Sequence, residues 1–233
     1  SNLDWGFSKH PPMSAFFILV FYKKCGAQYW AYYLLCLLFV LIAFYYVFKF
    51  ANEILGNISL ALISILLLTS IYFYNFTTPE FNVNVCQLPF WSMVVYYSWR
   101  IYDSKEIKLS DCLLVGIFAA IGFLSKYLFI YLLISIDLLF IYLFFFNKTK
   151  KFDFKYLITI EVFLVLLVPH FIGLCDNEFV TIFYGLKRTG LEESVIFDHI
   201  KYPLIFLVKQ IGILIPFFFL VFLLIKKFKF KFN

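Results

Sequence analysis

The sequence predicts an all-α protein, a polytopic transmembrane helical bundle with about seven spans and an interfacial helix in the first outer loop. Two observations predict this fold class. Of the 233 residues, 64% are hydrophobic and only 15% are charged, whereas soluble domains are typically about 45–50% apolar and about 25% charged. The apolar residues also fall into runs close to the roughly 20 residues that a spanning helix needs. A soluble bundle of this composition could not cover itself with polar surface.

The apolar runs place the elements in order along the chain. Spans are predicted at 30–50, 58–75, 84–101, 110–124, 127–146, 156–174 and 203–225. The stretch 12–22 is apolar but short, so we expect an interfacial or re-entrant helix there. Pro11 and Pro12 suit its start, because the first helical turn needs no backbone donor.

We expect one transmembrane domain over residues 1–233. It comprises an outer loop with the interfacial helix at 1–29, the bundle at 30–225 and a cytoplasmic tail or loop at 226–233. No methionine opens the sequence and a lysine-rich stretch ends it. We therefore expect a domain truncated at both ends.

The basic residues predict the orientation of the bundle. Alternate crossings of seven spans bring all four basic loops to one side, which the positive-inside rule makes the cytoplasm. The opposite side receives 1–29, 76–83, the turn at Ser125-Lys126 and 175–202, where the unusual polar residues collect. We therefore expect a site on the outer face. The basic loops carry Lys49, Arg100, Lys105, Lys108, Lys148, Lys150, Lys151, Lys155 and the terminal lysines.

Several classes of function lose support. The net charge of +6 is spread over short loops and forms no basic stripe of the kind that binds nucleic acid. The five cysteines show no CxxC spacing and are interpreted as small buried hydrophobes. No Walker motif, GxGxxG or HExxH is present, which disfavours ATP-driven transport, dinucleotide chemistry and zinc proteolysis.

The first candidate constellation lies before the interfacial helix. Lys9 and His10 precede the rigid Pro11-Pro12 pair, which would hold both cations at the membrane surface with little freedom. There they suit an anionic lipid phosphate. The alternative is an interfacial anchor with Trp5 at the headgroup level.

Two further candidates lie in short outer turns. Glu80, with Asn82 and Asn84 nearby, could act as a general base or bind a cation; the alternative is an ordinary proline turn with one solvated acid. Lys126 interrupts a long apolar run, and a cation there must reach water or an anionic partner. A phosphate is one such partner, and a snorkelling lysine in a hairpin turn is the alternative.

The outer segment 169–190 is the fourth candidate. It mixes acids and amides with Lys187 and Arg188, which lie between two glycines. Because arginine binds phosphate in a bidentate way, this segment could form a sugar-and-phosphate surface. A mobile loop between two spans is the alternative.

Five segments in order resemble a known family. They are LDWGFSKHPPM at 3–13, TTPEFNVNVCQLPFW at 77–91, GIFAAIGFLSKY at 116–127, PHFIGLCDNEFVTIFYGLKRTG at 169–190 and YPLIFLVKQIGILIP at 202–216. Together they resemble the polyprenyl-phosphate-sugar-dependent glycosyltransferases of fold class C. The branch is that of the bacterial relatives of dolichyl-phosphate-mannose protein mannosyltransferases (glycosyltransferase family 39-like) and the lipid A aminoarabinose transferases.

This resemblance implies transfer of a sugar from a polyprenyl-phosphate carrier to a lipid, glycan or protein acceptor. The site would face the periplasm from the bacterial inner membrane, among membrane lipids. The sugar would move in one displacement with inversion, and cationic groups would stabilise the leaving phosphate. No cofactor is certain, although Mg²⁺ or Mn²⁺ could take part.

The resemblance also implies roles for particular residues. Glu80 matches a second outer acid and is the catalytic candidate, while the main acidic motif would lie upstream of Ser1. The residues expected at the substrate, mainly around the carrier phosphate, are Lys9, His10, Asn84, Lys126, Tyr127 and Arg188.

Two alternatives to an active transferase stay open. A non-enzymatic transporter or lipid-flipping subunit would place polar groups and broken helices near the bilayer midplane, whereas here the unusual residues lie at one face. The other alternative is an enzyme remnant made inactive by truncation.

Overall fold

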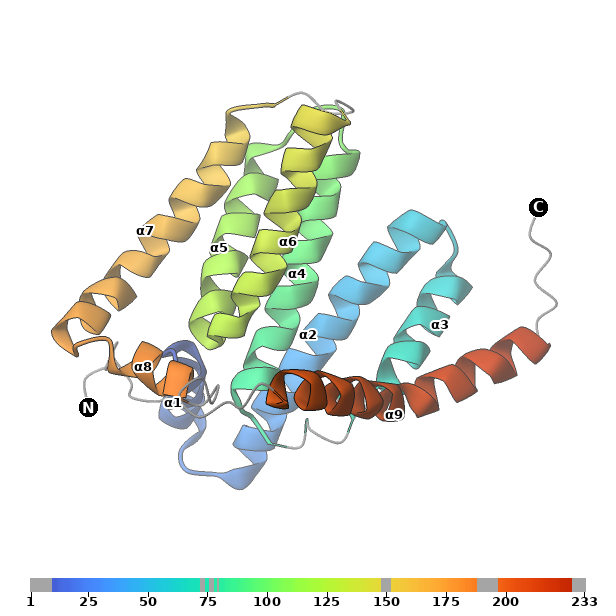
Figure 1. Ribbon diagram of the computed structural model, residues 1–233, viewed down its shortest axis with the longest axis horizontal. Helices are drawn as coiled ribbons and strands as arrows, with labels where there is room; N and C mark the ends of the chain where they lie inside the picture. Colours follow the sequence, from blue (N-terminus) through green and yellow to red (C-terminus); the bar gives the residue numbers. More distant parts are fainter. Residues whose placement is uncertain are drawn as a thin grey trace.

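The computed structural model describes residues 10–71, 74–75, 78, 80–147, 152–187 and 197–227, except for the side chains of 198, 199, 226 and 227. Every regular element in these residues is helical, as Figure 1 shows. The prediction of an all-α bundle is therefore confirmed. Four helical segments are long and apolar enough to cross a membrane, at Tyr29–Leu55, Tyr127–Phe146, Lys155–Asp176 and Ile200–Ile225.

The predicted interfacial helix is α1 (Met13–Cys25). It begins directly after Pro12, whose carbonyl accepts the N–H of Phe16 at 3.0 Å. It ends at Gly26, which has a φ of +71° and donates its N–H to the carbonyl of Tyr22 at 2.8 Å. A positive φ favours glycine, so this residue allows the chain to turn sharply into the next helix.

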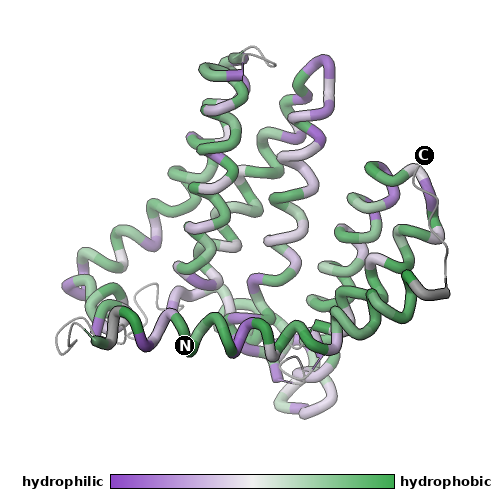
Figure 2. Tube along the Cα trace, turned by 45° about the vertical axis from the view of Figure 1, so that its right-hand side comes forward, coloured by the Kyte–Doolittle hydropathy of each residue, from purple (hydrophilic) through white to green (hydrophobic). Residues whose placement is uncertain are grey.

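The central bundle is formed by α2 (Tyr29–Leu55), α4 (Val83–Asp103), α5 (Leu109–Ser125) and α7 (Lys155–Asp176). Beside it runs α6 (Ile130–Ile141), which a 3-10 turn η2 (Tyr127–Phe129) precedes and a π-helical turn η3 (Tyr142–Phe146) follows. α4 packs against α2 and α5, and α5 packs against α7. In Figure 2 these helices are apolar along most of their length, with hydrophilic residues mainly near the turns.

Close helix packing depends on small residues in α5. A Cβ on Gly116 would lie 2.7 Å from the carbonyl oxygen of Thr159 on α7, so no larger side chain fits there. The hydroxyl of Thr159 donates to the carbonyl of Cys112 at 3.1 Å. Small residues allow helices to approach in a membrane, where side-chain hydrogen bonds also join them.

Three predicted boundaries are wrong. α3 (Ile58–Thr69) ends six residues before the end of the predicted span 58–75, so at 1.5 Å per residue it is only about 18 Å long. The outer segment 175–202 contains a helix, α8 (Val180–Lys187). α9 (Asp198–Lys227) begins before residue 203 and, in Figure 1, runs crosswise to the bundle rather than along it.

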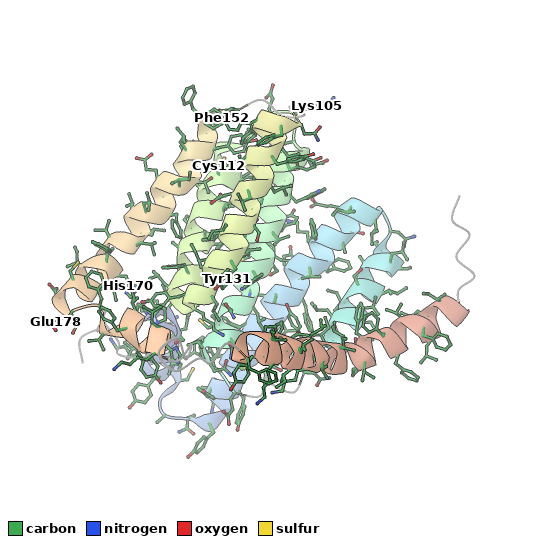
Figure 3. All side chains as sticks on the ribbon, viewed as in Figure 1. Lys105, Cys112, Tyr131, Phe152, His170 and Glu178 are labelled. Atoms are coloured by element: carbon green, nitrogen blue, oxygen red, sulfur yellow. The ribbon has the colours of Figure 1, made fainter. Side chains whose placement is uncertain are left out.

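The bundle has two ends with different residues. The basic end comprises the α2–α3 turn at Gly56, the α4–α5 connection 104–108 and residues 152–154 before α7. The site end comprises α1, the connection from α3 to α4, the turn at Ser125-Lys126, and α8. Figure 3 shows Lys105 and Phe152 at the basic end and His170 and Glu178 toward the site end.

The charge pattern agrees with the predicted topology over the described loops. Arg100, Lys105, Lys108 and Lys155 belong to the basic end, while Lys148, Lys150 and Lys151 lie outside the described residues. The site end nevertheless has basic residues too, because α1 carries Lys23 and Lys24 in its last turn. The excess of basic residues at the basic end therefore applies to the loops between the spans and not to every segment.

The cysteines follow the predicted pattern in part. Cys36, Cys86 and Cys112 are buried in the core, whereas Cys25 is partly buried and Cys175 is exposed. All five are free thiols.

Candidate functional site

The backbone around Lys126 is set by a close contact between α5 and η2. Lys126 is an extended residue, with φ −159° and ψ 128°, between the end of α5 and the start of η2. A Cβ on Gly122 would lie 2.4 Å from Cζ of Phe129, which is fully buried. The chain therefore folds back tightly over Gly122. The N–H of Lys126 donates to the Gly122 carbonyl at 3.1 Å, and the Lys126 carbonyl accepts the N–H of Phe129 at 3.0 Å.

The side chain of Lys126 is held by the first turn of α4. Its Nζ donates a hydrogen bond to Oδ1 of Asn84 at 2.5 Å. Asn82 caps this turn, because its side-chain oxygen accepts the N–H groups of Asn84 at 2.8 Å and of Val85 at 3.3 Å. A side-chain amide carries no charge, so the bond to Asn84 positions the ammonium without itself adding a negative charge.

A second set of contacts joins η2, α7 and α8 beside Lys126. The hydroxyl of Tyr127 and Nε2 of His170 lie 2.8 Å apart, within hydrogen-bond distance. His170 is on α7 and is 3% exposed. Thr181 on α8 is also buried and hydrogen-bonds Tyr127. Three elements that are distant in the sequence therefore converge on one phenol.

Lys126, Tyr127 and Thr181 line a cavity of about 420 Å³, which we name the Lys126 cavity. His10, Lys126 and Tyr127 bring an imidazole, an ammonium and a phenol to it. Leu128 and Ile130 provide part of an apolar wall. A cation next to apolar walls at the end of a membrane bundle suits an anionic group attached to an apolar chain.

Glu80 lies in a different hollow. It is exposed and lines a cavity of about 500 Å³ between α1 and the start of α2, which we name the Glu80 cavity. The segment carrying Glu80 is tied to α2, because the hydroxyl of Tyr32 donates to the Phe81 carbonyl at 2.5 Å and the thiol of Cys36 donates to the Thr78 carbonyl.

The structure thus brings together most of the predicted site residues. His10, Lys126 and Tyr127 share one cavity, and Asn84 contacts Lys126 directly. Glu80 lies four residues before Asn84 but lines the other cavity. Lys9 and Arg188 lie outside the described residues.

Two residues of the site were not predicted for it. His170 and Thr181 both lie in the outer segment 169–190, but the sequence pattern assigns neither of them a role. The sequence offers a weak signal for His170, an imidazole directly after Pro169 near the end of an apolar run. Its partner Tyr127 lies 43 residues away in the sequence, so spacing alone could not reveal the pair.

The predicted divalent cation stays a prediction. Within the part of the chain that the structure describes, no group of three or more His, Cys, Asp or Glu side chains could hold a metal ion. Glu80 is the acid closest in sequence to Asn84, and one carboxylate alone is a weak cation site.

Comparison with known proteins gives one match. No curated protein and no solved structure matches the chain. The profile of the family described as dolichyl-phosphate-mannose-protein mannosyltransferase matches residues 9–172, well over half of the chain. This region contains segments 77–91 and 116–127 and the Asn84–Lys126 contact. The chain is therefore a multi-pass membrane protein that belongs to the dolichyl-phosphate-mannose-protein mannosyltransferase family of membrane glycosyltransferases.

Proposed function

We propose that the protein transfers a sugar from a polyprenyl-phosphate carrier to a hydroxyl group of a lipid, glycan or protein acceptor. One observation carries this proposal. His10, Lys126 and Tyr127 line a single cavity with apolar walls at the site end, in a chain of this family. The cavity matches the two chemical parts of such a donor, a phosphate and a long hydrocarbon chain.

Lys126 would stabilise the leaving group. In the proposed step, the bond between the anomeric carbon and the phosphate oxygen breaks, and its electron pair stays on the phosphate. Negative charge then develops beside the Lys126 ammonium. A preorganised cation at the place where charge develops lowers the barrier without reorganisation. Asn84 supports this role, because its amide oxygen holds the ammonium in position.

The acceptor would be activated by a carboxylate. Its oxygen forms the new bond to the anomeric carbon, and its proton passes to the acid that lies next to it. Glu80 is the candidate for this acid. The single displacement inverts the configuration at the anomeric carbon.

The apolar part of the donor would stay in the membrane. The Lys126 cavity opens along the start of α6, where Leu128 is 51% and Tyr131 is 65% exposed. Both side chains line the cavity and also reach the outer surface of the bundle. A phosphate at Lys126 could therefore keep its isoprenoid chain among the membrane lipids.

The site end would face the periplasm of a bacterial inner membrane. Support comes from the positive-inside rule, because Arg100, Lys105, Lys108 and Lys155 belong to the opposite end. Lys9 and Arg188 are proposed as further phosphate contacts, on the resemblance alone.

The test is a transfer assay with the full-length protein in proteoliposomes. Polyprenyl-phosphate mannose serves as donor, and release of polyprenyl phosphate is measured in the presence of a membrane extract as source of acceptors. Lys126→Ala should lower turnover by about 10²–10³-fold, and Glu80→Ala should also lower it, both with unchanged membrane insertion. Lys105→Ala at the basic end is the matched control and should leave turnover unchanged.

Two results would count against the proposal. Unchanged turnover in both Lys126→Ala and Glu80→Ala would remove the assigned site. Movement of the intact donor across the bilayer without transfer would instead indicate a lipid-flipping protein.

A further inference from the structure

The Glu80 cavity has a composition unlike that of the Lys126 cavity. Three tyrosines of α2 line it together with Tyr22 of α1, Gln28 of the α1–α2 turn, and Glu80. Its functional groups are therefore aromatic rings, phenolic hydroxyls, one amide and one carboxylate, and no lysine or arginine is among the described residues that line it. The three α2 tyrosines are Tyr29, Tyr32 and Tyr33.

The walls of this cavity are fixed by backbone geometry. Gly26 ends α1 with a positive φ and donates its N–H to the carbonyl of Tyr22. The hydroxyl of Tyr32 holds the carbonyl of Phe81, so the segment carrying Glu80 is anchored to α2. The inner wall is formed by Ala31 and Leu35, which are 3% and 1% exposed. The cavity is therefore preformed, as ligand sites usually are.

The charges around the cavity select among ligand classes. Glu80 disfavours an anionic ligand, because like charges repel. Lys23 and Lys24 do not line the cavity, but they are exposed in the last turn of α1, directly before the turn residues that do. Their positive charges oppose the attraction of Glu80 for a cationic ligand. A neutral ligand with many hydroxyl groups fits best, because phenols, amides and carboxylates all hydrogen-bond to hydroxyls.

The tyrosines add a preference of shape. A tyrosine presents a flat apolar face with a polar end, and a sugar ring likewise has apolar C–H faces and a polar edge. Tyr22 and Tyr33 are 56% and 54% exposed, so their rings are available to a ligand that approaches from the membrane boundary.

We infer that the Glu80 cavity is the acceptor subsite and that it takes a neutral sugar ring. This inference rests on the proposed transfer reaction and narrows its acceptor to the glycan class. A hydroxyl of the bound ring gives its proton to the Glu80 carboxylate while its oxygen bonds to the anomeric carbon of the donor. The phosphate of the donor leaves with the electron pair of the broken bond. Asn82 and Asn84, at the start of α4, follow Glu80 closely in the sequence, and Asn84 contacts Lys126 of the other cavity.

The inference is tested by direct binding. Full-length protein in nanodiscs of phosphatidylglycerol and phosphatidylethanolamine is studied by saturation-transfer-difference NMR. The probes are the methyl glycosides of mannose, glucose, galactose and N-acetylglucosamine, with tetramethylammonium as a cationic probe. At least one glycoside should receive saturation on its ring protons, and tetramethylammonium should receive none.

The variants identify the cavity. The double variant Tyr22→Leu/Tyr33→Leu should weaken glycoside binding by about tenfold. Neither ring is part of the core, so the helical circular dichroism spectrum should be unchanged. Tyr45→Leu is the matched control, because Tyr45 is also on α2 and is 57% exposed but lies outside the cavity. It should leave glycoside binding unchanged.

Several results would overturn the inference. The first is saturation of none of the four glycosides. The second is glycoside saturation in the double variant equal to that in the wild type, and the third is saturation of tetramethylammonium alone. The first two would make the tyrosines interfacial anchors. Failure of the transfer reaction is separable from these results. Donor turnover without glycoside binding refutes only the acceptor subsite, whereas glycoside binding without donor turnover refutes the transferase and keeps the sugar site.

Discussion

At the basic end of the α4–α5 pair, Arg100 lies 3.3 Å from the carboxylate of Asp111, whose side chain is 5% exposed. At the site end of the same pair, Lys126 donates to the neutral amide of Asn84. Both contacts join α4 to α5 and both involve a basic residue near the membrane boundary. They differ in the charge of the partner.

The two contacts therefore differ in kind. The Arg100–Asp111 contact is an ion pair, and Arg100 also lies over the rings of Tyr96 and Tyr97. The Asn84–Lys126 contact is a hydrogen bond that positions the ammonium through an uncharged amide. The residue type alone would not distinguish the two cations, so the partner is the informative feature.

Asn84→Asp replaces the neutral amide that contacts Lys126 with a carboxylate, which is the type of partner that Arg100 has at the basic end. It should have the largest effect. The new carboxylate would neutralise Lys126 and repel the donor phosphate. Turnover of polyprenyl-phosphate mannose should fall by about 100-fold, equivalent to ~2.7 kcal/mol. The melting temperature should not fall. Asn84→Ser, which keeps the partner neutral, should cost much less, and equal losses in the two variants would contradict the comparison.

Asp111→Asn is the reverse exchange at the basic end. It leaves Arg100 beside a neutral group and removes a buried ion pair, so the free energy of unfolding should fall by ~2 kcal/mol. Turnover per folded molecule should stay at the wild-type level. Asp103→Asn, an exposed acid of the same end, should change stability by less than about 0.5 kcal/mol. Thermal unfolding in detergent measures both, and a loss of turnover in folded Asp111→Asn would break the division between the ends.

Gly122→Ala tests whether the geometry at the site end depends on the close turn. The added Cβ would meet the ring of Phe129, and overpacking of this kind costs ~1.5 kcal/mol. Because the same turn positions Lys126, turnover should fall along with stability. Gly212→Ala, where nothing lies within 4 Å of the added Cβ, should lower neither. Wild-type turnover in Gly122→Ala would show that the turn does not position Lys126.

Tyr127→Phe should have the smallest effect. It removes the hydroxyl that contacts His170, at a cost of ~1 kcal/mol. The KM for the donor should rise about fivefold, while Tyr142→Phe, an exposed tyrosine of η3, should change nothing. In a double-mutant cycle with His170→Leu, additive losses would mean that the contact does not contribute.

Hydropathy predicted where the helices lie but not how each one ends or turns. The span 58–75 was predicted too long because Ile71, Tyr72, Phe73 and Tyr74 continue the apolar run. The helix ends earlier, where the hydroxyls of Thr69 and Ser70 bond the carbonyls of Leu66 and Leu67. Such local competition for backbone carbonyls leaves no trace in a hydropathy average.

The missed helix and the crosswise helix have different causes. α8 follows Glu178 and Phe179, whose positive φ values turn the chain, and its mixed polarity made it resemble a loop. α9 was predicted as a span because it is long and apolar. Length and composition do not encode direction, which depends on contacts such as that with α3.

The candidate site was predictable in its location and not in its contacts. Alternating crossings placed Glu80, Asn84 and Lys126 at one end, and the structure has them there. The bond between Asn84 and Lys126 joins residues 42 positions apart, and it requires the packing of α4 on α5. That packing depends on side-chain shapes in three dimensions, which a linear pattern does not contain.

Lys126 is a single extended residue between two helical segments, so its backbone joins them directly. A tilt of α6 relative to α5 would therefore shift the backbone of Lys126 relative to Asn84. Membrane helices change their tilt to match the thickness of the surrounding hydrocarbon layer. The acyl-chain length of the surrounding lipid would therefore influence the position of the Lys126 ammonium relative to Asn84.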